Sequence, residues 1–146
     1  MDVMSEAILN KIEENYKATN TLSDDDYEML YYTFGDMAGN ALALLETSTI
    51  HKIETLPPSS YGLYKIESGS RKVYYVSRKC HICQCKFFKF KVKRDRAKQT
   101  CKHNVFCRMA LILGEVGSPI TIKLEDLAGY LNDIFSTTET LPVRRP

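Results

Sequence analysis

CQCKFFKFKVKRDRAKQTCKH, residues 83–103, is the stretch that decides the fold of this 146-residue chain. It opens with Cys83 and Cys85 and closes with Cys101 and His103. Thiolate and imidazole groups are preferred ligands of zinc, and structural zinc sites take four ligands in a tetrahedron. Two ligand pairs at the ends of one short segment therefore predict one structural zinc ion, bound by these four side chains.

The position of each pair in its expected element supports this site. Residues two apart on a strand point to the same side, so Cys83 and Cys85 are expected to face one ion from a strand. The apolar pattern after His103 predicts a helix, which places Cys101 and His103 in its first turn. There the positive end of the helix dipole favours a thiolate.

The residues between the two pairs alternate in character. Phe88, Phe90 and Val92 fall on one side of an extended chain, and the lysines between them fall on the other. This period of two predicts a strand with a buried aromatic side. The expected unit is a short hairpin followed by a helix, closed over zinc.

Two further cysteines leave the ligand set open at one point. Cys80 stands three residues before Cys83, a spacing also typical of zinc ligands, so Cys80 could replace Cys83 or Cys85 or lie beside the site. Cys107 comes one turn after His103 and is interpreted as a small core residue facing the site. Five clustered cysteines, an odd number, favour metal binding in a reducing compartment over a disulfide framework.

The two ligand pairs together resemble the SWIM-type zinc finger. The resemblance extends over residues 27–113 to the small SWIM-domain proteins of Shu complexes. It is carried by YYTFGDMAGNALALLETSTI (31–50), KVYYVSRKCHICQC (72–85) and CKHNVFCRMAL (101–111). Two residues depart from the pattern: Lys86 stands where many SWIM fingers have proline, and Cys107 adds a thiol inside the helix.

This resemblance implies a function. Proteins of this kind are nuclear and non-enzymatic, and each pairs with a RecA-like recombinase paralogue. The pair helps the RecA-type recombinase to assemble on single-stranded DNA during homologous recombination, in the repair of DNA damage. By resemblance, this chain is expected to be such an adaptor, with zinc holding its docking surface in shape.

Charge is distributed unevenly along the chain. Residues 1–70 carry 4 basic and 12 acidic side chains, net −8, whereas residues 71–102 carry 12 basic and 1 acidic, net +11. Residues 103–146 carry 4 and 5, net −1, which brings the whole chain to +2. A zinc site with three thiolates needs only part of this positive charge, so the surplus predicts a polyanion or an acidic partner surface.

The alternative function is therefore a stand-alone zinc-dependent module that binds single-stranded nucleic acid through residues 71–102. Phe87 and either Tyr74 or Tyr75 are aromatic rings of this segment that could stack on bases. KVKRDRAK (91–98) also resembles a nuclear import signal. An enzyme is not expected, because the one histidine placed to pair with a cysteine is used by the zinc pattern, and no phosphate-binding loop or nucleophile elbow is present.

Apolar spacing predicts helices over residues 2–18, from the cap Ser23 to about Gly35, and over 36–46. Asp24, Asp25 and Asp26 follow Ser23 and are interpreted as first-turn carboxylates rather than a cation site. An apolar face left over from these helices is expected to meet a partner. Alternation predicts strands over 49–56, 62–68 and 72–78, the last two as a hairpin, and helical spacing returns over 124–134, before a frayed tail at 137–146.

These elements predict an α+β protein with N-terminal helices, a small antiparallel β region and a zinc-closed hairpin-and-helix finger. Residues 1–70 are expected to form the helical and β region, 71–114 the SWIM finger, and 115–146 a C-terminal helix and tail. Neither an apolar run that could span a bilayer nor a signal peptide is expected.

Overall fold

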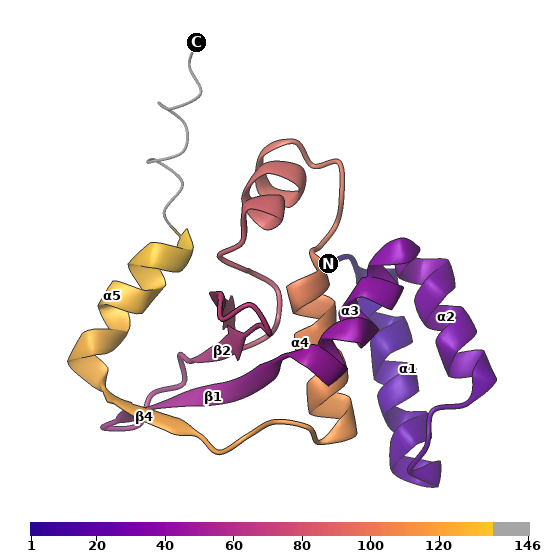
Figure 1. Ribbon diagram of the computed structural model, residues 1–146, viewed down its shortest axis with the longest axis horizontal. Coiled ribbons are helices and arrows are strands. Elements are labelled where there is room, and N and C mark those ends of the chain that lie inside the picture. The colour runs from indigo at the N-terminus through magenta and orange to yellow at the C-terminus, as the bar shows by residue number, and fades with distance from the viewer. Residues whose placement is uncertain (136–146) are drawn as a thin grey trace.

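The computed structural model describes residues 1–135, leaving aside the side chains of Asp133 and Phe135 (Figure 1). The predicted α+β class is confirmed, and the tail predicted at 137–146 lies outside the described residues. The elements in chain order are α1 (Val3–Thr19), α2 (Asp24–Phe34), α3 (Asp36–Thr47), β1 (Thr49–Leu56), β2 (Leu63–Glu67), β3 (Val73–Ser77), the π-helix η1 (Phe88–Arg94), α4 (Lys102–Leu113), β4 (Ile120–Lys123) and α5 (Leu124–Phe135).

A four-stranded sheet with the order β3-β2-β1-β4 forms the centre of the molecule. The predicted hairpin of β2 and β3 is confirmed, and β1 pairs with β2 in the same antiparallel sense. β4 was not predicted, and it lies parallel to β1 at the edge of the sheet. Its four residues carry only two apolar side chains, so the local pattern is too short to predict a strand without its partner.

Alternation along the strands divides the apolar side chains between two clusters. Ile50 pairs with Ile66, and both belong to the main core beneath α4. Ile53 pairs with Leu63, and both lie in a smaller cluster with Leu127 of α5. Figure 1 shows α1, α2 and α3 gathered on one side of α4, with α5 at the far end of the sheet.

α2 begins as the sequence predicts, at a Ser23 cap with a carboxylate in its first turn. The Asp26 N–H donates to Ser23 Oγ at 3.2 Å, and the Ser23 N–H donates back to Asp26 Oδ2 at 2.9 Å. The other carboxylate oxygen accepts a hydrogen bond from Asn15 of α1 at 3.0 Å. Asp26 is therefore fully buried as a tie between two helices.

Replacing Asp26 with alanine is expected to cost about 1–3 kcal/mol of unfolding free energy, because the Ser23 N–H and Asn15 both lose their acceptor. Burial by itself raises the pKa of Asp26, but the hydrogen bonds from Asn15 and Ser23 outweigh it, so the pKa is lowered. This stabilisation is present above the unfolded-state pKa and is lost as the pH falls through the lower folded-state pKa. Urea denaturation at pH 7 and pH 3 should show a smaller difference between wild type and variant at pH 3. Asp25→Ala, at an exposed neighbour, is the matched control.

α4 connects the N-terminal helices to the sheet. Eight of its residues are buried, and α4 lies against α3, α1 and β3. Arg108 of α4 forms a salt bridge with Glu6 and donates a hydrogen bond to Asn10 at 2.8 Å, both on α1. His81 Nε2 lies 3.2 Å from the same Glu6 carboxylate. The predicted division of the chain into segments at residues 70 and 114 stays a prediction. The main core contains side chains from both sides of residue 70.

The segment between the two ligand pairs is helical, and the strand predicted there is wrong. Phe88 is buried in η1, and Val92 packs against the main core one turn later. Residues 88 and 92 share a face of a helix as well as a face of a strand, so the apolar pattern fits both. A strand would also need a partner edge, and β3 contributes only the isolated bridge between Val76 and Cys83.

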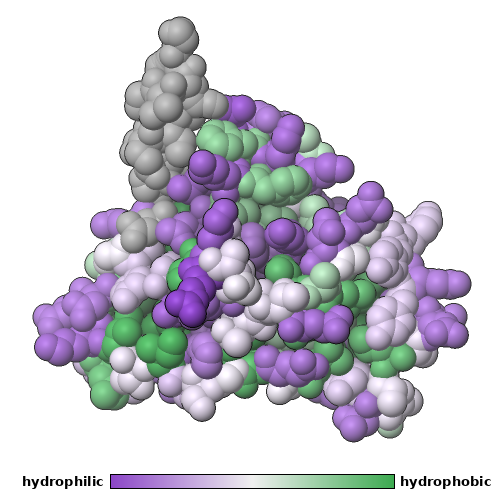
Figure 2. All heavy atoms as spheres, viewed as in Figure 1, coloured by the Kyte–Doolittle hydropathy of each residue, from purple (hydrophilic) through white to green (hydrophobic). Residues whose placement is uncertain are grey.

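Hydrophilic residues cover much of the face seen in Figure 2, with hydrophobic residues in smaller groups in its lower part and near its top. No helix in the described part of the chain is long and apolar enough to cross a membrane.

Candidate metal centre

Cys83, Cys85, Cys101 and His103 come together in one buried cluster. One ligand atom from each lies within 4.8 Å of the ligand atoms of the other three. Ligands of a tetrahedral zinc ion with Zn–S bonds of about 2.3 Å are roughly 3.5–4 Å apart, so four ligand atoms within 4.8 Å of one another are close enough to surround one such ion. Three sulfurs and one imidazole nitrogen provide a complete ligand set for one structural zinc ion.

The first pair is held by the turn that leads into η1. Cys83 pairs with Val76 of β3 through an isolated bridge. The Cys85 N–H donates to Cys83 Sγ at 3.4 Å, and the Phe88 N–H donates to Cys85 Sγ at 3.4 Å. Cys85 therefore lies at the start of the helical segment, and not on a strand with Cys83 as predicted. Both thiols still converge, because backbone N–H groups are directed at each sulfur.

The second pair lies at the start of α4, as the sequence predicts. Cys101 is the N-cap residue and His103 is in the first turn. The ring of Tyr74 from β3 packs against the His103 ring at a centroid distance of 4.2 Å and an interplanar angle of 31°. His103 Nδ1 is buried and has no hydrogen-bond partner among the described residues. A buried nitrogen without a partner is costly, and a cation bound at this nitrogen would provide the missing interaction.

The pKa values of the three thiols also favour a bound cation. Burial raises the pKa of Cys101 to about 12. Hydrogen bonds donated to Cys101 and then to Cys85 raise the pKa of Cys83. The pKa of Cys85 is lowered, because Cys101 and then Cys83 donate hydrogen bonds to its sulfur. The cluster by itself thus stabilises one thiolate, whereas a zinc ion at its centre would stabilise three.

Cys80 lies outside this cluster. Its thiol donates to Cys107 Sγ at 2.7 Å, and both side chains are fully buried. Burial raises the pKa of Cys107 well above its ordinary value. The two side chains therefore pack against each other in the core, and the cluster of four does not include Cys80.

The packing of Tyr74 on His103 was missed by the sequence reasoning. The period of two along β3 places Tyr74 and Val76 on the core side, which was a usable signal. The alternation could not show that Cys101 and His103, at the start of α4, lie against that side.

Comparison with known proteins identifies two relatives. The chain is 30% identical over 139 residues to "Zinc finger SWIM domain-containing protein 7 homolog" of Dictyostelium discoideum, which covers 95% of this chain and 85% of that protein. It is 28% identical over 100 residues to "Zinc finger SWIM domain-containing protein 7" of Danio rerio, 68% of this chain and 70% of that protein. No family model and no solved structure matches the chain.

Proposed function

Because the chain belongs to the family of zinc finger SWIM domain-containing protein 7, we propose that it is a non-enzymatic adaptor whose fold is stabilised by one zinc ion. Similarity to a relative along 95% of the chain carries this proposal. The five cysteines, which are the strongest potential nucleophiles, are all buried, and four zinc ligands leave no open position for chemistry.

The adaptor pairs with a RecA-like recombinase paralogue in the nucleus and promotes assembly of the recombinase filament during homologous recombination. The resemblance of residues 27–113 to Shu-complex SWIM proteins supports this role. The zinc cluster ties the segment after β3 to α4, and α4 packs directly on α1 and α3. Metal binding therefore stabilises the helices that a partner would contact.

A surface suited to such a partner lies on α1 and α2. Tyr27, Tyr31 and Tyr32 are 40%, 48% and 94% exposed. A groove of about 890 Å³ runs beside them, and its lining includes Ile8, Met29, two carboxylates (Asp25 and Glu28) and one lysine (Lys11). Exposed tyrosines beside an apolar floor are typical of protein interfaces, and the carboxylates predict a basic rim on the partner. We place the paralogue on this surface.

The direct test is co-expression with a RecA-like paralogue, followed by measurement of complex mass and zinc content. One zinc ion per chain in a stable one-to-one complex is the expected result. A zinc-loaded chain that stays monomeric in the presence of such paralogues would overturn the adaptor role.

Replacing Tyr32 with serine is expected to weaken the complex by about tenfold or more, since truncation of an aromatic residue at an interface centre costs 1–2 kcal/mol or more. The side chain is 94% exposed, so its loss should leave the fold intact. Titration calorimetry with the purified paralogue measures the change. Tyr61→Ser, at a tyrosine that is 71% exposed and outside this surface, is the control. Equal affinities of the two variants would place the interface elsewhere.

A further inference from the structure

A second and larger groove lies over the zinc cluster. Its volume is about 1250 Å³, and Cys85, Cys101 and His103 form part of its lining. The other walls come from the junction of α2 and α3, the start of β3, the turn into η1 and the segment that precedes α4. The groove is thus built by parts of the chain that the zinc site and α4 hold together.

Five lysines line this groove: Lys72, Lys86, Lys89, Lys98 and Lys102. Four of them, all but Lys89, are exposed, and within residues 1–135 none of these four forms an ion pair. Asp36 is the one carboxylate among the lining residues that the structure describes. This excess of positive charge in a concave surface attracts a polyanion.

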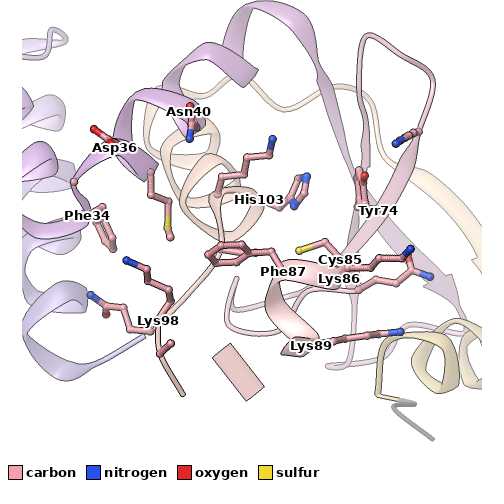
Figure 3. Close-up of a pocket in the computed structure, with 18 of the residues that line it drawn as sticks. Phe34, Asp36, Asn40, Tyr74, Cys85, Lys86, Phe87, Lys89, Lys98 and His103 are labelled. Atoms are coloured by element: carbon pink, nitrogen blue, oxygen red, sulfur yellow. The ribbon is translucent and has the colours of Figure 1, made fainter. Parts of the chain in front are cut away.

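Aromatic rings lie between these positive charges. Phe87 is 41% exposed, although its neighbour Phe88 is buried. Figure 3 shows the Phe87 ring in the middle of the groove, between Lys98 on one side and Lys86 and Lys89 on the other. Tyr74 contributes a second ring on the wall, packed against His103. An exposed phenylalanine ring surrounded by lysines offers a stacking surface beside phosphate contacts.

We propose that this groove binds single-stranded nucleic acid, with phosphates on the lysines and a base stacked on Phe87. A single strand presents unpaired bases and phosphates together, which matches a ring flanked by cations. In a duplex the bases are stacked inside and leave Phe87 without a partner. An acidic peptide would satisfy the lysines but not the exposed ring.

The groove depends on the zinc site for its shape. Lys86 and Phe87 follow Cys85 directly, and Lys102 stands between Cys101 and His103. Three groove residues therefore lie within two residues of a zinc ligand along the chain. Nucleic-acid binding does not require the paralogue proposed above, since the groove shares only Thr33 with the lining of the groove beside Tyr32.

The zinc-loaded full chain should bind a fluorescently labelled 20-nucleotide oligothymidine, measured by anisotropy between 50 and 300 mM salt. Its log-affinity should fall with log salt with a slope of about −2 to −3, as for three or four phosphate contacts to a single strand. The combined variant Lys86→Ala, Lys98→Ala, Lys102→Ala should bind about tenfold more weakly or worse, with a slope shallower by about 2. Lys79→Ala, Lys91→Ala, Lys93→Ala removes the same charge at exposed positions outside the groove and is the control.

Phe87 provides an independent readout, because the chain contains no tryptophan. Phe87→Trp should keep the binding, and its fluorescence should be quenched when a base stacks on the indole. Phe87→Ala should weaken binding by about 5- to 150-fold, the range that stacking on one base provides.

Three results would overturn the proposal. They are equal losses of affinity in the groove and control triple variants, unchanged affinity in Phe87→Ala, or a polyglutamate peptide that binds the groove as tightly as the oligonucleotide. A 20-nucleotide oligouridine distinguishes RNA from DNA as the ligand. Tighter binding of either oligonucleotide supports the proposal and identifies the ligand. A Tyr32→Ser chain that still binds the oligonucleotide would separate this site from the partner surface.

Discussion

Replacing Cys101 with serine is expected to release the zinc ion and unfold residues 80–113. The apparent binding free energy of a structural zinc ion is on the order of 10–16 kcal/mol at pH 7, comparable to the whole stability of a small domain. Cys101 is fully buried at the N-cap of α4, so a lost ligand also leaves uncompensated thiols in the core. His103→Ala should have the same effect. Zinc content by elemental analysis and helicity by circular dichroism measure both losses, and binding to the paralogue should fail with them.

Cys80→Ser is the matched control for this prediction. Cys80 is as buried as Cys101 but pairs with Cys107 outside the cluster, so this variant should lose some stability and keep one zinc ion per chain. A Cys101→Ser chain that stays folded with its zinc would show that the metal is not structural. If Cys80→Ser lost its zinc and Cys85→Ser kept it, Cys80 rather than Cys85 would be the zinc ligand.

Replacing Phe106 with alanine is expected to cost about 3–5 kcal/mol of unfolding free energy, as large-to-small changes at packed aromatic positions do. Phe106 is 1% exposed in the middle of α4, in the core shared by the N-terminal helices and the sheet. α4 also carries Cys101 and His103 at its start, so a loosened helix should bind zinc more weakly. Urea denaturation of the zinc-loaded protein and competition with a zinc chelator measure the two effects.

Leu111 on the same helix provides the control. It is 36% exposed, so Leu111→Ala should cost less than about 1 kcal/mol. Equal costs for the two substitutions would mean that α4 does not hold the core together, and that the finger is an independent module attached to the helices.

Much of the fold was predictable because its signals are local. A helix start depends on groups within one turn, as with Ser23 and Asp26, and α1, α2 and α3 begin and end close to their predicted positions. The same holds at the metal centre. The four side chains that come together in the cluster are the four that the two pairs and their expected helix predict. Zinc chemistry needs particular donor atoms, and few residue types supply them.

The features that were missed depend on contacts between distant segments. β4 becomes a strand because Ile120 pairs with Ile53 of β1, and nothing in its own four residues requires that pairing. The segment after Phe87 is helical, with the Phe88 N–H bonded to Cys85 Sγ and the Phe88 side chain buried in the core. Its alternation alone suits a strand equally well.

Residue types and their close spacing were enough to predict zinc, the four candidate ligands and the uneven distribution of charge. The tertiary structure alone decided where these features meet: Cys80 with Cys107, Tyr74 with His103, and five lysines with Phe87 in one groove. Residue chemistry is a property of each position, whereas a surface is built from elements that only folding brings together, through burial of the apolar side chains between them.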